Sequence, residues 1–336
     1  MTGDDQWPVA SGRRLTGNRR LATGNRESII HRMRCFYSDT FVLPLPEGHR
    51  FPMAKYSGLR ERLLRDGIVS AAELHEAPQA SWKDLGLVHA AGYLQAVEQG
   101  TLPREALRRI GFPWSLQMVE RARRSVGATM AAAHAAGHAG CAANLAGGTH
   151  HAFADRGEGY CVFNDVAVAS RVLQRDTGVR RIAIIDCDVH QGNGTAAIFT
   201  GDTDMFTLSM HGARNYPFRK ETGDLDVELE DGTGDEPYLA HLAHSVDMIL
   251  RTHRPEVVFY LAGADPFEGD RLGRLELTID GLQRRDELVM DRCCGTGLPV
   301  VVTMSGGYAA NVDDIVTIHA NTIRVASSIT LSPRSA

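Results

Sequence analysis

Segments typical of β-strands alternate with segments typical of α-helices along most of this chain, and this alternation limits the fold more than any other feature. We expect strands at residues 35–41, 142–146, 181–186, 205–210, 256–261 and 299–304. We expect helices at residues 55–66, 71–76, 114–138, 166–174, 237–252, 281–293 and 311–327. Strand followed by helix, repeated this often, predicts an α/β fold with a mostly parallel sheet covered by helices on both faces. The polar, glycine-rich residues 201–234 are interpreted as a long functional loop.

The composition narrows the class of protein. The 336 residues fit one large α/β domain or two small ones, and no internal repeat or linker divides them. A net charge of −5 argues against general nucleic-acid binding, and no apolar run is long enough to span a membrane. The six cysteines are scattered, with only Cys293 and Cys294 adjacent, which favours reduced thiols in a cytoplasmic protein.

The first 32 residues differ from the rest of the chain. They are polar and arginine-rich without periodicity, so we expect a disordered N-terminal extension. A basic tail that touches nucleic acid, a targeting peptide and a translation start at Met33 are the alternatives. We therefore predict an extension at 1–32, one folded domain at 33–328 and a C-terminal tail at 329–336.

Asp186, Asp188 and His190 stand two residues apart at the end of the expected strand 181–186. This spacing places all three on one face of an extended backbone. Two carboxylates and an imidazole that converge at a strand end are typical of a divalent-metal site, and a strand end with solvated acids and a turn is the plainer alternative.

Polar motifs follow four other expected strands. The carboxyl ends of parallel strands meet at one edge of a sheet, which is where such folds form their sites. The four motifs are Gly147-Gly148-Thr149-His150-His151, Ser209-Met210-His211, Gly263-Ala264-Asp265 and Ser305-Gly306-Gly307-Tyr308. Polar residues at five strand ends predict a catalytic crevice.

Three of these residues suggest the metal. Asp188, His190 and Asp265 supply three ligands and leave a fourth position open for water or substrate, which is typical of catalytic zinc. A metal in such a site polarises a carbonyl and lowers the pKa of its bound water. Taken alone, Asp265 is more typical of a helix N-cap than of a metal ligand.

Four further residues suggest proton transfer. His150 and His151 are candidate base and acid, because imidazole titrates near neutral pH. Asp186 is a suitable acceptor to orient one of the imidazoles, and Tyr308 a suitable donor to a developing oxyanion. Taken singly, the histidine pair is also typical of a satisfied loop and Tyr308 of a packing residue.

Taken together, the motifs resemble the zinc-dependent histone deacetylase superfamily. Besides the strand ends, the matching segments are residues 159–165 (GYCVFND), 186–194 (DCDVHQGNG) and the opening 41–53, which looks like the bacterial branch grouped with class IV enzymes. The resemblance covers roughly residues 33–328. It implies that these residues form a histone deacetylase-like catalytic domain. It implies a single-domain arginase/deacetylase fold, with an eight-stranded mostly parallel sheet flanked by helices on both faces.

The resemblance implies a metal set. It places Zn²⁺, or Fe²⁺ in cells, on Asp188, His190 and Asp265. It also implies a structural K⁺ held by oxygens of a second group of residues. These are Asp186, Asp188, His190, Ser209 and Met210.

The resemblance also implies roles around the metal. His150 and His151 match the tandem catalytic histidines, and Tyr308 matches the tyrosine that polarises the acyl carbonyl. Asp186 matches the carboxylate behind the first histidine. Asn193 falls where many members carry aspartate behind the second, and its neutral amide should keep the pKa of that imidazole lower than an aspartate would. The channel walls would be Gly159, Tyr160 and Tyr216, and no residue matches the rim aspartate of class I enzymes.

We therefore expect a zinc-dependent hydrolase that removes acetyl or longer acyl groups from lysine side chains, with His151 donating the proton to the leaving amine. Its partner would be an acyl-lysine protein or an acylated small amine, with no nucleic acid and no membrane. Three alternatives remain: an acetylpolyamine or other small-molecule amidohydrolase, a non-catalytic acyl-lysine binding protein, and a dinuclear arginase-type hydrolase. The last needs additional aspartate ligands where His150 and His151 stand.

Overall fold

The structure is a computed structural model that describes residues 33–328. The predicted N-terminal extension at 1–32 and the predicted tail at 329–336 lie outside these residues. Within the described part, no helix is both long enough and apolar enough to cross a membrane.

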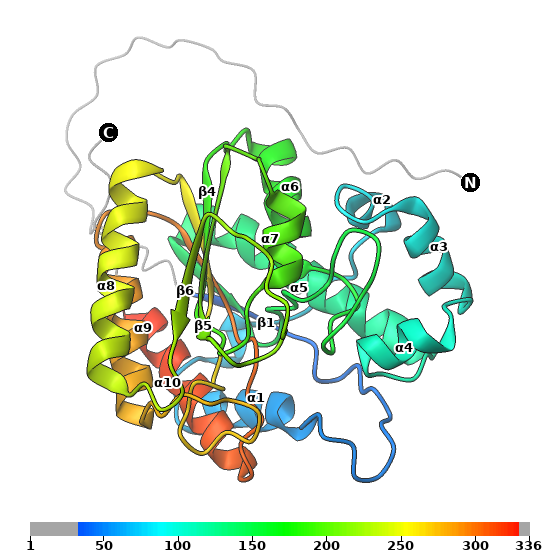
Figure 1. Ribbon diagram of the computed structural model, residues 1–336, viewed down its shortest axis with the longest axis horizontal. Coiled ribbons are helices and arrows are strands. Elements are labelled where there is room, and N and C mark those ends of the chain that lie inside the picture. The colour runs from blue at the N-terminus through cyan, green and yellow to red at the C-terminus, as the bar shows by residue number, and fades with distance from the viewer. Residues whose placement is uncertain (1–32, 329–336) are drawn as a thin grey trace, which may run out of the picture. The chain divides into compact units, whose positions relative to one another are not determined.

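One eight-stranded sheet forms the centre of the described chain, and every neighbouring pair of strands is parallel. Its order is β2-β1-β3-β8-β7-β4-β5-β6, and Figure 1 labels β1, β4, β5 and β6 within it. The strands are β1 (Arg34–Tyr37), β2 (Leu74–Glu76), β3 (Cys141–Asn144), β4 (Ile182–Asp186), β5 (Met205–Gly212), β6 (Leu225–Leu229), β7 (Val257–Leu261) and β8 (Val300–Thr303). The predicted fold class is confirmed, and the sheet is wholly rather than mostly parallel.

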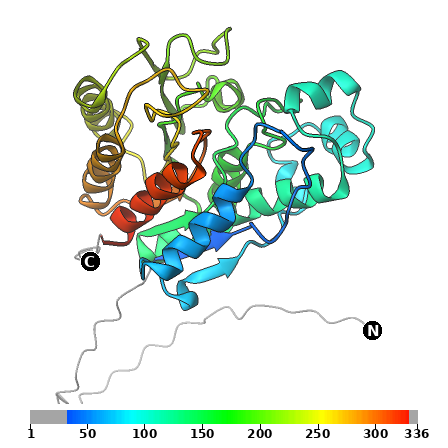
Figure 2. The ribbon, with the colours of Figure 1, turned by 90° about the horizontal axis from the view of Figure 1, so that it is seen from below.

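Helices cover both faces of the sheet. Figure 1 shows α8, α9 and α10 on one side and α5, α6 and α7 on the other, and Figure 2 shows α1 beside α10. The helices are α1 (Ala54–Arg65), α2 (Trp82–Leu85), α3 (Ala91–Gln99), α4 (Arg104–Ile110), α5 (Leu116–Ala139), α6 (Asp165–Thr177), α7 (Asn193–Phe199), α8 (Asp235–Thr252), α9 (Ile279–Cys294) and α10 (Val312–Ser328). The short helices α2, α3 and α4 share a third apolar cluster with α5 and α6.

The central strands are apolar at successive positions because both of their faces are buried. In β4, Ile182 and Ile184 pack under α5 and α6, whereas Ala183 and Ile185 pack under α8, α9 and α10. Alternate side chains of a strand point to opposite faces, so one run of apolar residues supplies both halves of the core. The sheet therefore holds its strand ends in fixed register.

Two predictions of secondary structure were wrong. Residues 71–76, expected to be a helix, form a short 3₁₀ turn (Ala71–Glu73) followed by the edge strand β2. Residues 201–234, interpreted as a loop, contain most of the second edge of the sheet, with β5 reaching Gly212 and β6 beyond it. Both missed strands lie at an edge and have partly exposed residues, so they lack the continuous apolar run that marks a buried strand.

Candidate active site

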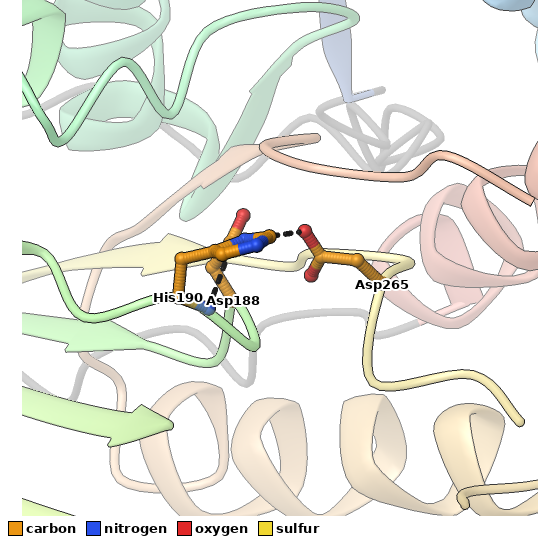
Figure 3. A group of neighbouring side chains, drawn as sticks. All are labelled: Asp188, His190 and Asp265. Carbon is orange, nitrogen blue, oxygen red and sulfur yellow. Dashed lines mark hydrogen bonds and ion pairs between the residues drawn. The ribbon is translucent and has the colours of Figure 1, made fainter. Parts of the chain in front are cut away.

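The predicted metal ligands meet at the carboxyl edge of the sheet. Asp188 and His190 follow β4, and Asp265 follows the neighbouring strand β7, whose register places Leu261 opposite Asp186. One potential ligand atom from each of the three residues lies within 4.8 Å of the others, and all three side chains are buried (Figure 3). The His190 Nδ1 atom is 3.0 Å from Asp188 Oδ1 and 3.2 Å from Asp265 Oδ2.

The environment of these three residues fits a divalent cation. The Oδ2 atom of Asp265 is buried without a hydrogen-bond partner in the described residues, although Oδ1 accepts the Val189 N–H at 2.9 Å. Burial, followed by the nearby Asp188 carboxylate, raises the pKa of Asp265 to about 7. Two carboxylates this close without solvent call for a positive charge between them. One imidazole with two carboxylates is a donor set that zinc and other first-row divalent metals accept.

Hydrogen bonds from the β8 loop fix the Asp188 carboxylate. Its Oδ2 atom accepts the Ser305 hydroxyl at 2.7 Å and the Gly306 N–H at 2.7 Å. A Cβ on Gly306 would overlap Asp265 Oδ2 and also approach Asp188 Oδ2. Glycine is therefore the residue that lets this loop close over the carboxylates.

His150 is paired with a carboxylate. The strand β3 leads into the Gly147-Gly148 turn, and His150 follows it with Nδ1 2.6 Å from Asp186 Oδ2. Burial of His150 favours its neutral form, but Asp186 and Asp188 outweigh this effect and raise the pKa of His150 to about 9. The second-sphere partner that the sequence predicted thus lies beside the first histidine.

His151 is paired with an amide. Its Nδ1 atom is 2.7 Å from Asn193 Oδ1, at the first residue of α7. Burial, followed by the positive fields of His150 and His190, holds the pKa of His151 well below its usual value. Asn193 carries no charge to offset these effects, which agrees in direction with the prediction made for it. With Oδ1 as acceptor, the Nδ1 atom of His151 carries the proton and Nε2 keeps its lone pair.

Tyr308 faces the same cavity. Its side chain is 8% exposed, and burial, followed by Asp188 and Asp265, raises its pKa well above the usual range. The phenol therefore keeps its proton at neutral pH. Among the described residues, none accepts a hydrogen bond from its hydroxyl, so this group is free to donate to a ligand.

The predicted channel walls surround this centre. Gly159, Tyr160 and Tyr216 line one cavity with His151, His190 and Tyr308. The ring of Tyr216 meets the His151 ring edge-on at 5.0 Å between centroids, and the Tyr160 ring is 6.0 Å from that of Tyr308. A second cavity continues inward from the same residues to the buried cations Lys55 and Arg121.

A tight turn positions the Tyr160 wall. Gly159 and Tyr160 have φ of 57° and 65°, and the Cys161 N–H bonds to the Glu158 carbonyl at 2.9 Å, as in a type I′ turn. A left-handed tyrosine is uncommon and costs on the order of 1–3 kcal/mol, which is typical of functional sites. A Cβ on Gly159 would overlap the His151 ring, so the turn also lies directly against the second histidine.

The sequence interpretation missed two supporting residues. Glu158 accepts a hydrogen bond from Asn193 Nδ2 at 2.8 Å and another from the Tyr216 hydroxyl at 2.9 Å. Arg285, fully buried in α9, donates from Nη1 to the Gly263 carbonyl at 2.6 Å, two residues before Asp265. Glu158 directly precedes the GYCVFND motif, but neither residue stands at a strand end or within a segment that carries the family resemblance.

The residues suggested for K⁺ lie on two adjacent strand ends. Asp186 is opposite Ser209 in the register of β4 and β5, and Met210 follows in β5. The Ser209 hydroxyl is 3.3 Å from the Gly192 N–H and 3.0 Å from His211 Nδ1. The cation itself stays a prediction.

Comparison with known proteins identifies the family. The model of the histone deacetylase domain matches residues 49–323. The chain is 34% identical to histone deacetylase 2 of Arabidopsis thaliana over 83% of this chain and 75% of that protein. It is 31% identical to the histone deacetylase-like amidohydrolase of Pseudomonas aeruginosa over 79% of this chain and 74% of that protein. This chain belongs to the histone deacetylase family of hydrolases.

Two further similarities extend this result. An uncharacterized protein of Picosynechococcus is 45% identical over 87% of this chain and 98% of its own length. The crystal structure of a histone deacetylase homologue complexed with SAHA superimposes with a TM-score of 0.76 at 25% identity, covering 87% of this chain and 84% of that one. The predicted superfamily and its fold are confirmed.

Proposed function

We propose that this chain is a zinc-dependent lysine deacylase that removes acetyl or longer acyl groups by hydrolysis of the amide. The observation that carries the proposal is that His151, Tyr308 and the expected metal ligands Asp188 and His190 line one cavity, with Asp265 completing the ligand group. A non-catalytic acyl-lysine binding protein would need the pocket but no basic imidazole beside the metal ligands.

Asp188, His190 and Asp265 would hold the zinc. When bound, zinc supplies Lewis acidity that polarises an acyl carbonyl and acidifies a water molecule. The family membership and the buried Asp265 Oδ2, which has no hydrogen-bond partner within residues 33–328, support this assignment. Fe²⁺ suits the same ligands.

The chain's own groups would move the protons. His151 has a free Nε2 lone pair in its neutral form, so it is suited to take a proton from water and to return it to the leaving amine nitrogen. Tyr308 would donate its hydroxyl to the acyl oxygen as that atom gains negative charge. His150, held by Asp186, would donate from Nε2 on the same side.

Two further assignments, the compartment and the branch of the family, belong to the proposal. The six cysteines of the chain are all free and buried, which favours a reducing compartment such as the cytoplasm. The opening at residues 41–53 supports a class IV-like member.

The test is turnover by the purified protein on acyl-lysine peptides and acetylpolyamines, with metal content measured in parallel. We expect peptide hydrolysis that is lost on chelation and restored by zinc. Activity confined to acetylpolyamines would move the substrate to small amines. One bound zinc without any turnover would replace the hydrolase with the acyl-lysine binding protein.

A further inference from the structure

Within the described part of the chain, the outer mouth of the channel is lined by four arginines and by no carboxylate. Arg108 and Arg109 come from the end of α4, Arg214 from the loop after β5, and Arg274 from the loop before α9. We call these four residues the arginine rim. The cavity that they open into is the one that contains His151, His190 and Tyr308.

Carboxylates nearby neutralise only part of this charge. Arg214 and Arg274 share Asp231, at 3.7 and 3.2 Å, and Arg109 reaches the exposed Glu105 at 3.6 Å. Within residues 33–328, Arg108 makes no ion pair. Exposed pairs of this kind are weak, so the guanidinium groups stay available to a ligand.

The rim contrasts with the charge of the whole chain. The net charge is −5, so a local excess of positive charge at the mouth is not a consequence of overall composition. Interactions between exposed charges are screened beyond about 10 Å at 0.1 M salt. The rim therefore acts on groups that pass directly through the mouth.

Phe218 adds an apolar contact to the same mouth. Its side chain is 88% exposed, and its ring lies 6.5 Å from that of Tyr216 in the channel wall. Guanidinium groups beside an exposed aromatic ring suit carboxylates carried on a peptide chain. The same guanidinium groups repel the ammonium groups of lysine and of polyamines.

We propose that the arginine rim selects acyl-lysine substrates whose flanking residues carry carboxylates, and that it disfavours cationic acetylpolyamines and basic peptides. The proposal rests on the proposed function and narrows its substrate class. The reacting amide is neutral, so the selection acts on binding and leaves the chemical step unchanged.

The experiment compares three acetyl-lysine peptides that differ only in flanking Glu, Ala or Lys, together with acetylspermidine. At low salt we expect kcat/KM to fall by about tenfold from the Glu peptide to the Ala peptide and by about tenfold again to the Lys peptide. The change should come from KM. At 0.5 M salt the differences among the three kcat/KM values should shrink. Acetylspermidine should rank with the Lys peptide.

Charge reversal at the rim gives the matched test. Arg108→Glu and Arg274→Glu should each lower kcat/KM for the Glu peptide several-fold and raise it for the Lys peptide. The control is Arg251→Glu, which makes the same charge change at the end of α8, near the opposite edge of the sheet, and should alter neither value.

Peptide binding to the Tyr308→Phe variant, followed by fluorescence anisotropy, separates the two proposals. If Tyr308→Phe binds the Glu peptide preferentially but the wild-type protein hydrolyses none of the peptides, the result supports selection by the arginine rim and overturns the hydrolase proposal. Equal turnover of all three peptides, or a preference for the Lys peptide or acetylspermidine, would overturn the rim while the hydrolase stands.

Discussion

Asn193 lies between His151 and Glu158 and bonds to both. Its Oδ1 atom is 2.7 Å from His151 Nδ1, and its Nδ2 atom is 2.8 Å from Glu158 Oε1. An amide has one accepting end and one donating end, whereas a carboxylate only accepts. Glu158 thus fixes which end of Asn193 faces the histidine, and through it the tautomer that leaves His151 Nε2 unprotonated.

The first prediction follows from this arrangement. Glu158→Gln can offer an N–H to Asn193, so the amide can turn and present its own N–H to His151. We expect kcat to fall by roughly 10- to 100-fold with little change in KM, as for other residues that orient a catalytic group. Steady-state kinetics on an acetyl-lysine peptide measures both values.

A rescue variant separates orientation from general damage. Asn193→Asp in the Glu158→Gln background has only acceptor atoms toward His151, so orientation no longer matters and kcat should recover. Tyr216→Phe removes the other hydrogen bond to Glu158 and should cost less. Wild-type kcat in Glu158→Gln would show that the carboxylate has no positioning role.

Removal of the Tyr308 hydroxyl should slow the reaction without releasing metal. The hydroxyl has no acceptor within residues 33–328, so Tyr308→Phe breaks no internal hydrogen bond. We expect kcat to fall about 10²- to 10³-fold, the usual loss for one donor to an oxyanion, with zinc content unchanged. Metal analysis and kinetics on one preparation check this, and full turnover would remove Tyr308 from the mechanism.

Two glycine substitutions with the same chemical change should have opposite results. In Gly306→Ala the added methyl group would overlap the carboxylate oxygen of Asp265, so we expect loss of bound zinc and of activity. In Gly137→Ala, within α5, nothing lies within 4 Å of the new Cβ, and stability should rise by about 0.5–1 kcal/mol. Normal zinc content in Gly306→Ala would mean that the loop moves away at little cost.

Stability should fall between about pH 6.5 and pH 4 because of a buried histidine far from the metal ligands in sequence. His89 lies 3.0 Å from the Phe153 carbonyl through Nδ1 and accepts the Asn164 N–H through Nε2, and burial lowers its pKa to about 4. The unfolded chain binds a proton below about pH 6.5 and the folded chain does not until about pH 4. The free energy of unfolding should therefore be lower by about 3 kcal/mol once the pH has fallen to about 4.

Thermal unfolding followed from pH 7 to pH 4 tests this linkage. The Tm of His89→Gln, which keeps a donor and an acceptor, should fall less steeply than that of the wild type, whatever its value at pH 7. His138→Gln, at an exposed site in α5, should keep the wild-type slope. Burial also lowers the pKa of His211 to about 4, so some slope should remain. Parallel curves for His89→Gln and wild type would contradict the prediction.

The sequence predicted the buried half of the fold better than its edges. Strands β4, β7 and β8 are buried at every position and are apolar up to their last residues, so their positions and the polar residues at their ends were predicted. The edge strands β2 and β6 are partly exposed, and nothing in their short mixed sequences separates them from loops.

The same limit applies to the site. The residues at strand ends were predicted to converge, and the sheet brings Asp188, His190 and Asp265 together. Their catalytic roles stay predictions. Glu158 supports the site through hydrogen bonds from Asn193 and Tyr216, and Arg285 through one to the Gly263 carbonyl. Such pairings depend on side-chain positions that no periodicity encodes.

Two backbone hydrogen bonds connect the end of α4 to the channel wall. The N–H groups of Gly159 and Tyr160 donate to the carbonyls of Arg109 and Ile110, at 2.9 and 2.7 Å. The end of α4, which carries Arg108 and Arg109 of the arginine rim, is thus hydrogen-bonded directly to the turn that carries Tyr160. The mouth and the wall of the channel are therefore parts of one hydrogen-bonded unit, and a displacement of Arg109 would move Gly159 and Tyr160 with it.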